Sequence, residues 1–146
     1  MAGYRHIVFA TDLTEAADTA AERVADQARC SGGRVTLLHV VEYLPGEVAG
    51  LMEERDDPES YIRKKAEKRL ADWAERVHLS DAERHVTLTS YSARRGIIEY
   101  LDEQQADVVV LGALGNPGRL GTTVDHVAAS APCDVLIVQG KGWTPG

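Results

Sequence analysis

The sequence predicts a single α/β domain in which helices cover both faces of a parallel sheet. Strand-like runs alternate with segments of helical periodicity along all 146 residues. Two of the runs, Val35–Leu38 and Val108–Leu111, are built without interruption from leucine and β-branched residues, which is typical of strands buried on both faces. No repeat, low-complexity tract or linker divides the chain. We therefore expect one doubly wound domain over residues 1–146, with five parallel strands and about four helices.

The first half of the chain supplies two strands and one helix. The run Tyr4–Ala10 is expected to be a strand that ends in a turn, and Thr14 suits the N-cap of the helix that follows. Ser31–Gly33 ends this helix, and Arg34–Val41 is the second strand. Small residues at helical spacing let the helix lie close to the sheet, namely Ala17, Ala20, Ala21, Val24 and Ala28.

The middle of the chain begins with a segment of no clear period. Glu42–Pro58 is expected to be a long surface loop, and whether it forms a lid stays open. A helix follows over Glu59–Val77, with its basic residues on the solvated side. The third strand, His85–Tyr91, alternates enough to lie nearer a sheet edge.

The last part of the chain supplies two helices and two strands. Arg94–Gln105 is expected to be a helix, and Asp107–Leu111 is an almost wholly apolar strand. A loop with four glycines, Gly112–Gly121, runs into a helix capped by Thr122 or Thr123. The last strand is Asp134–Gln139, and the tail 140–146 is expected to be frayed.

Composition limits the classes of function. The net charge of −7 disfavours the phosphate backbone of nucleic acid as a partner. The two cysteines, Cys30 and Cys133, are too few for a disulfide framework and are expected to be reduced. The chain opens without the apolar run of a signal peptide, and no stretch approaches the roughly 20 apolar residues that span a bilayer. We therefore expect a cytoplasmic protein that does not enter a membrane.

Two strand ends carry the residues that could bind a ligand. In open α/β sheets, ligands bind at the carboxyl ends of the strands, where the strand order reverses. Thr11 and Asp12 follow the first strand, and the glycine loop follows the fourth. Glycines that lead into a helix N-terminus can present N–H groups to a phosphate, but they can equally form a tight turn with no ligand. The residues alone leave both interpretations open.

The sequence shows no catalytic constellation. Its five histidines include no pair at helical metal-ligand spacing, and there is no Gly-x-Ser-x-Gly or Cys-x-x-Cys motif. His39 lies inside a strand and is expected to be a hydrogen-bonded core histidine. We therefore expect no catalytic residues and no metal site.

Four segments of the sequence resemble the universal stress protein family: Tyr4–Thr14, Val35–Val40, Asp107–Gly112 and Gly121–Val138. The last is the most specific, since Gly-Thr opens a helix and Ala-Pro-Cys precedes a final apolar strand. The resemblance implies a sheet of order 3-2-1-4-5, with Asp12 beside the glycine loop. It also implies a homodimer formed through Asp134–Gln139.

The resemblance implies a nucleotide site as well. ATP-binding members carry Gly-x2-Gly-x9-Gly-[Ser/Thr], and Gly112 and Gly115 match its first half. Only five residues separate Gly115 from Gly121, so the phosphate loop is four residues short. The branch typified by universal stress protein A, which the opening of this chain resembles, does not bind ATP. Carried over by position, the ligand residues are Thr11, Asp12 and Val40 for adenine and ribose, and Gly112, Gly115, Gly121, Thr122 and Thr123 for phosphate.

Three functions follow from these observations. The first is a stress-response regulator that binds ATP or AMP, with Mg²⁺ accompanying ATP, and acts as a dimer. The second is a nucleotide-free dimeric protein that works through an unidentified protein partner. The third is a weak ATPase. The short loop discriminates between the first two. The third would be slow at most, because the sequence offers no general base and no clear Mg²⁺ site, and only Asp12 and Asp125 are candidates for a carboxylate near the γ-phosphate.

Overall fold

The computed structural model describes residues 3–43, 57–113 and 122–139, with only the backbone described for Glu15 and Ala16. Strands and helices alternate along these residues as the sequence predicts. The elements are β1 (His6–Ala10), α1 (Glu15–Ser31), β2 (Arg34–Glu42), α3 (Pro58–Arg76), β3 (Glu83–Thr89), α4 (Ala93–Glu103), β4 (Val108–Ala113), α5 (Thr122–Ser130) and β5 (Asp134–Gln139).

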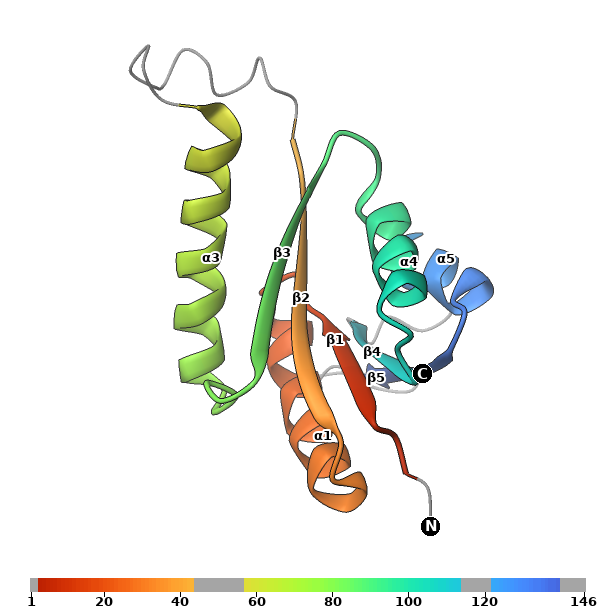
Figure 1. Cartoon of the computed structure of the whole chain (residues 1–146). Coiled ribbons are helices and arrows are strands. Elements are labelled where there is room, and N and C mark those ends of the chain that lie inside the picture. The colour runs from red at the N-terminus through yellow and green to blue at the C-terminus, as the bar shows by residue number, and fades with distance from the viewer. Residues whose placement is uncertain (1–2, 44–56, 114–121, 140–146) are drawn as a thin grey trace, which may run out of the picture.

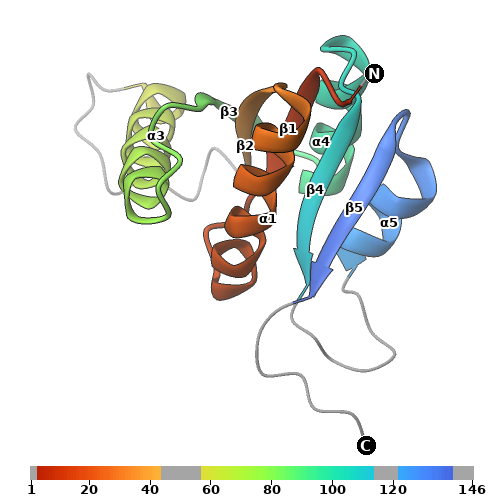
Figure 2. The same ribbon diagram turned by 90° about the horizontal axis from the view of Figure 1, so that it is seen from below.

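The five strands form one parallel sheet of order β3-β2-β1-β4-β5, which confirms the expected fold. Helices α1 and α3 cover one face, and α4 and α5 cover the other (Figure 1). Strand β3 lies at one edge of the sheet, as its alternating sequence predicts. The other edge is β5, which Figure 2 shows beside β4.

Strand β1 is the centre of the core. Ile7, Val8 and Phe9 are completely buried, because β2 and β4 flank the strand and helices cover both faces. Ile7 and Phe9 point toward α1 and α3, whereas Val8 points toward α4 and α5. Strand β2 divides in the same way, with Leu37 and Leu38 in opposite layers. The unbroken apolar runs in the sequence correspond to this burial on two faces.

Helix α1 lies close to the sheet because its inner face is made of small residues. Ala17, Ala20, Ala21 and Val24 are buried, and Ala28 is partly buried against the same core. The helix ends at Gly32, which adopts a φ of 70° and donates its N–H to the carbonyl of Ala28. This left-handed conformation costs glycine little, which explains the stop signal in the sequence.

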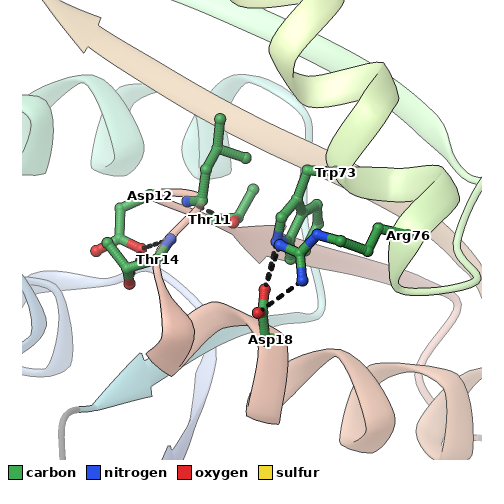
Figure 3. Close-up of polar contacts among 7 residues, drawn as sticks. Thr11, Asp12, Thr14, Asp18, Trp73 and Arg76 are labelled. Carbon is green, nitrogen blue, oxygen red and sulfur yellow. Dashed lines mark hydrogen bonds and ion pairs between the residues drawn. The ribbon is translucent and has the colours of Figure 1, made fainter.

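A carboxylate joins the two helices on the α1 and α3 face (Figure 3). Asp18 of α1 accepts a hydrogen bond of 2.7 Å from Trp73 Nε1 and two of 2.9 and 3.0 Å from the guanidinium of Arg76. The Arg76 hydrogen bonds, aided by that from Trp73, hold the pKa of Asp18 below its ordinary value, against the opposing effect of burial. The Trp73 ring in turn packs edge-on against Phe9 of β1, with ring centroids 5.5 Å apart. Asp18 thus connects both helices to the centre of the sheet.

A buried polar pair lies under the other helical layer. His6 and Thr36 are almost completely buried, and His6 Nε2 lies 2.9 Å from Thr36 Oγ1. Arg34 donates toward Nδ1 of the same ring, so the neutral ring carries its proton on Nε2 and donates to Thr36. Burial, followed by the charge of Arg34, lowers the pKa of His6.

Several element boundaries differ from the sequence prediction. Strand β1 begins at His6, not Tyr4, because the carboxylate of Asp107 takes the N–H groups of Arg5 and His6 at 2.9 and 2.8 Å. Helix α5 begins at Thr122, so Thr122 and Thr123 both lie inside it and neither is its N-cap. Thr14 is the N-cap residue of α1, but its side chain makes no capping hydrogen bond.

Some expectations concern residues that the structure does not describe. The central part of the predicted surface loop (44–56), the end of the glycine loop (114–121) and the tail (140–146) fall outside the described residues. Both cysteines are free thiols, as expected. Within the described part of the chain, none of the helices is long and apolar enough to cross a membrane.

The Asp18 contact generates a prediction about stability. Asp18→Ala leaves Trp73 Nε1 and the Arg76 guanidinium without their acceptor, so we expect the free energy of unfolding to fall by about 2–3 kcal/mol at pH 7. Chemical denaturation measures this loss. The control is Asp26→Ala on the same helix, which removes an exposed ion pair with Arg29 and should cost less than about 1 kcal/mol. Equal losses in the two variants would contradict the prediction.

Candidate functional site

The candidate site lies where the central strand is shorter than its neighbours. Strand β1 ends at Ala10, whose register partner is Leu38, while β2 continues to Glu42. On the other side, Phe9 pairs with Val110, and β4 continues to Ala113. The carboxyl ends of β2 and β4 therefore extend past β1 and flank a gap. This is the switch point of the strand order, where open α/β sheets bind ligands.

A cavity of about 130 Å³ occupies this gap. Its walls come from both layers of the fold and from three strand ends. Most of the lining that the structure describes is apolar, and three polar side chains interrupt it. The lining residues are Ala10, Thr11, Asp12, Ala17, Leu38, Val40, Ala93, Ile97, Leu111, Gly112, Thr123 and Val124.

The turn after β1 forms the floor of the cavity. Local hydrogen bonds fix the shape of this turn (Figure 3). The N–H of Thr11 donates to the Leu38 carbonyl at 2.9 Å, and Thr11 Oγ1 accepts from the N–H of Leu13 at 3.0 Å. Asp12 Oδ1 accepts from both the N–H and the hydroxyl of Thr14, at 3.0 and 2.5 Å. Leu13 has a φ of 65°, which is uncommon for a branched residue and requires such support from its surroundings.

Asp12 keeps one carboxylate oxygen available. Its side chain is exposed, and among the described residues no hydrogen bond to Oδ2 is present. Because Oδ1 is held by Thr14, the carboxylate has a fixed orientation at the cavity. A carboxylate held in this way can accept hydrogen bonds from the hydroxyl groups of a ligand.

His39 supports the turn from the opposite face of the sheet. Its Nδ1 donates to the Thr11 carbonyl at 2.9 Å, so the neutral ring carries its proton on Nδ1. Burial is the main cause that lowers the pKa of His39 below its ordinary value, and the charge of Arg69 acts in the same direction. The hydrogen bond to Thr11 and the charge of Asp12 oppose the shift. The side chain is therefore a half-buried, hydrogen-bonded histidine, close to the sequence expectation.

The structure brings together five of the residues singled out in the sequence. Thr11, Asp12, Val40, Gly112 and Thr123 all line the cavity. Thr122 is exposed at the start of α5 and does not line it. Gly115 and Gly121 fall outside the described residues. Asp125, the second carboxylate considered for chemistry, is exposed on α5 and is also absent from the lining.

Helix α4 contributes a wall that the sequence analysis missed. Ala93 and Ile97 line the cavity, and the N–H of Ala93 donates to Glu42 Oε1 at 2.5 Å. Glu42 thus caps α4 from the end of β2, whereas the N-cap residue Ser92 makes no side-chain capping bond. Apolar helix residues do not indicate a ligand site in a sequence. A capping contact between residues fifty-one positions apart cannot be recognised in a sequence either.

The described residues contain no group of three or more histidine, cysteine, aspartate or glutamate side chains that could hold a metal ion. A Mg²⁺ ion that arrives with ATP is normally held largely by phosphates and water, so it needs no such cage.

Comparisons with known proteins agree with the fold. The family described as "Universal stress protein family" matches residues 3–139. Universal stress protein A homolog 1 of Coxiella burnetii is 28% identical, and the match covers 94% of this chain and 98% of that protein. The solved structure of universal stress protein UspA from Lactobacillus plantarum is 24% identical, covers 94% of this chain and 99% of its own, and superposes with a TM-score of 0.68.

Two solved structures with the same fold are described with nucleotides. The universal stress protein from Archaeoglobus fulgidus is described in complex with dAMP; it is 24% identical, with coverage of 92% and 98% and a TM-score of 0.64. A universal stress protein family member from Arabidopsis thaliana is described with AMP bound; it is 16% identical, with coverage of 94% and 93% and a TM-score of 0.62.

The His39 contact predicts a pH-dependent effect on stability. At pH 8, His39→Leu should lower the free energy of unfolding by about 1 kcal/mol, because the Thr11 carbonyl loses its donor. Because the pKa of His39 is lowered in the folded state, unfolded chains bind this proton more readily, and the wild type loses stability as the pH falls below about 6.5. The leucine variant lacks this loss.

The difference between wild type and His39→Leu should therefore narrow between pH 8 and pH 5.5, as measured by urea denaturation at each pH. The contribution of His6 is common to both proteins and cancels in the difference. His126→Leu, on the exposed side of α5, controls for the removal of a surface imidazole. A difference that stays constant or widens toward low pH would be inconsistent with this role of His39.

Proposed function

The chain belongs to the universal stress protein family, and from this premise we propose that it is a nucleotide-responsive stress regulator that binds AMP or ATP and acts as a dimer. The observation that supports nucleotide binding is the cavity at the switch point. It gathers Thr11, Asp12, Val40, Gly112 and Thr123 from elements far apart in the sequence. The dAMP and AMP complexes of two proteins with this fold support the choice of ligand.

The cavity suits the base and ribose of a nucleotide. Its volume of about 130 Å³ is below the roughly 300–1,000 Å³ of a pocket that encloses a whole drug-sized ligand, so it admits one part of a nucleotide. The apolar side chains of Leu38, Ile97 and Val124 fit the faces of a base. The available oxygen of Asp12 would accept from ribose hydroxyls at the floor of the cavity.

The backbone of Val40 provides polar groups at the same place. Backbone groups alternate sides along a strand, and the Leu38 carbonyl already faces β1. The N–H and C=O of Val40 therefore face the same side, beyond the point where β1 ends. These two groups would hydrogen-bond the edge of a base. Gly112 and Thr123 lie on the side where a phosphate would meet the N-terminal end of α5.

The sheet edges favour β5 as the surface that pairs in the proposed dimer. Val135, Leu136, Ile137 and Val138 are only half buried, as expected for an apolar edge that a second copy would cover. At the opposite edge, Arg63 of α3 donates to the Val86 carbonyl of β3 at 2.7 Å. This bond occupies a backbone acceptor of β3 and hinders the addition of a strand there.

The second candidate function is a dimeric interaction protein without nucleotide. The observation that favours it is the sequence from Asn116 to Leu120, which makes the phosphate loop four residues shorter than in ATP-binding members. A weak ATPase is a third candidate. It would depend on Asp12, the one carboxylate among the described residues that line the cavity, as the group near the phosphates.

Nucleotide binding is tested by recovery and titration. The protein, purified without added nucleotide, is denatured, and released small molecules are identified by mass spectrometry. Calorimetric titration with AMP and ATP then gives affinities. Asp12→Ala should weaken AMP binding by about tenfold or more, because a hydrogen bond to a charged group contributes roughly 1.5–3 kcal/mol. Asp26→Ala, on the outer side of α1, should bind like the wild type.

The absence of both co-purified nucleotide and binding heat in the wild type would favour the nucleotide-free function. Heat of AMP binding that Asp12→Ala leaves unchanged would place the ligand away from the cavity. ATP turnover lost in Asp12→Ala would support the third candidate.

The dimer is tested by native mass spectrometry and sedimentation. We expect a species of twice the 15.9 kDa mass of the chain. Ile137→Lys places a charge on the half-buried edge strand β5 and should increase the monomer fraction by about tenfold or more. Arg84→Ala on the opposite edge strand β3 should leave the dimer intact. A monomeric wild type, or a dimer disrupted by Arg84→Ala alone, would contradict the proposal.

A further inference from the structure

The wall between β2 and α4 has one point of unusually close approach. Gly96 of α4 is buried against β2, and a Cβ placed at this residue would lie 2.9 Å from Cγ1 and 3.7 Å from Cγ2 of Val40. Atoms of this kind do not approach to 2.9 Å without displacement of one of them. The absence of a side chain at residue 96 therefore lets α4 lie directly on Val40.

The same contact borders the cavity. Val40 lines the cavity, and so do Ala93 and Ile97, which flank Gly96 on α4. Valine is β-branched and has few alternative rotamers, so its side chain cannot easily give way. A methyl group at residue 96 would move Val40 toward the cavity or lift α4 from the sheet. Either displacement changes the width of the space between β2 and α4.

A second contact fixes the same helix at its start. The bond from the Ala93 N–H to Glu42 ties the first residue of α4 to the last residue of β2. Glu42 lies on the same strand as Val40, so one strand end holds α4 at two points. The first turn of α4 has no acidic residue of its own to interact with the helix dipole. The position of this wall therefore depends on the contacts with β2.

We propose that the contact between Gly96 and Val40 sets the width of the cavity and thereby selects the ring system that the cavity admits. Gly96 is a positioning residue for ligand binding, because it acts on the ligand through Val40. The inference rests on the proposed nucleotide function and adds a determinant of its selectivity. A purine has a larger ring system than a pyrimidine, so a reduction of the space between β2 and α4 should exclude the base of AMP more than that of CMP.

Calorimetric titration of AMP and CMP into wild type and Gly96→Ala tests the inference. Overpacking typically costs 1–3 kcal/mol, so Gly96→Ala should weaken AMP binding by about tenfold or more, and should weaken CMP binding less. Alanine is a better helix former than glycine by about 0.5–1 kcal/mol, which offsets part of the overpacking cost, so the thermal midpoint should fall only slightly. A general loss of structure would instead weaken the binding of both ligands equally.

A double-mutant cycle identifies the steric cause. Val40→Ala removes both atoms that the new methyl group would meet, so adding Gly96→Ala to this background should change the affinity for AMP less than about threefold. Asp102→Ala, on the exposed side of the same helix, controls for substitution in α4 and should bind like the wild type.

The outcomes separate the two proposals. A wild type that binds neither nucleotide overturns the proposed function and this inference with it. A wild type that binds AMP while Gly96→Ala binds equally well overturns only the inference. An effect of Gly96→Ala that is as large in the Val40→Ala background as in the wild type also overturns it, since contact with Val40 would then not be the cause.

Discussion

The length of the central strand is the constraint on which the rest of the site depends. Strand β1 is paired on both sides and completely buried at Ile7, Val8 and Phe9, yet it ends at Ala10 while β2 and β4 continue. Because β1 stops early, the backbone groups and apolar side chains at the ends of β2 and β4 face each other across the gap. The turn at Thr11 and Asp12 closes the bottom of this space. The cavity is thus a direct consequence of a difference in strand length within one sheet.

The turn that forms the floor of the cavity is held by local and by distant contacts. Leu13 has a positive φ, which costs a non-glycine residue of order 1–3 kcal/mol. The Thr11 side chain, the Asp12 carboxylate and the His39 ring each hold part of this turn. His39 comes from the face covered by α1 and α3, whereas most of the cavity wall belongs to the other face. Contacts from both faces of the sheet therefore hold this one turn. A loss of packing on the α1 side would displace the turn and, with it, the residues that line the cavity.

The sequence predicted the architecture because periodicity and burial on two faces leave strong patterns. Val35–Leu38 and Val108–Leu111 predicted strands buried on both faces, and the alternation in β3 indicated a position near an edge. The resemblance to the family supplied the strand order, and it brought Thr11, Asp12, Val40, Gly112 and Thr123 to one place. Contacts between distant elements left no such pattern. Neither the capping of α4 by Glu42 nor the bonds from Asp18 to Trp73 and Arg76 follows from spacing, because each depends on the packing of complete helices.

Helix α4 illustrates why such contacts decide the properties of a site. Its first turn carries Arg94 and Arg95, which the positive end of a helix dipole disfavours, and its N-cap side chain makes no capping bond. Local sequence therefore provides little reason for the helix to start where it does, and the position comes from Glu42 and from the close fit of Gly96 on Val40. The cavity wall that α4 forms is apolar, so in the proposed function this wall would act on a ligand through its shape and not through side-chain hydrogen bonds. Gly96, which lies behind Val40, would then influence the choice of ligand without touching it.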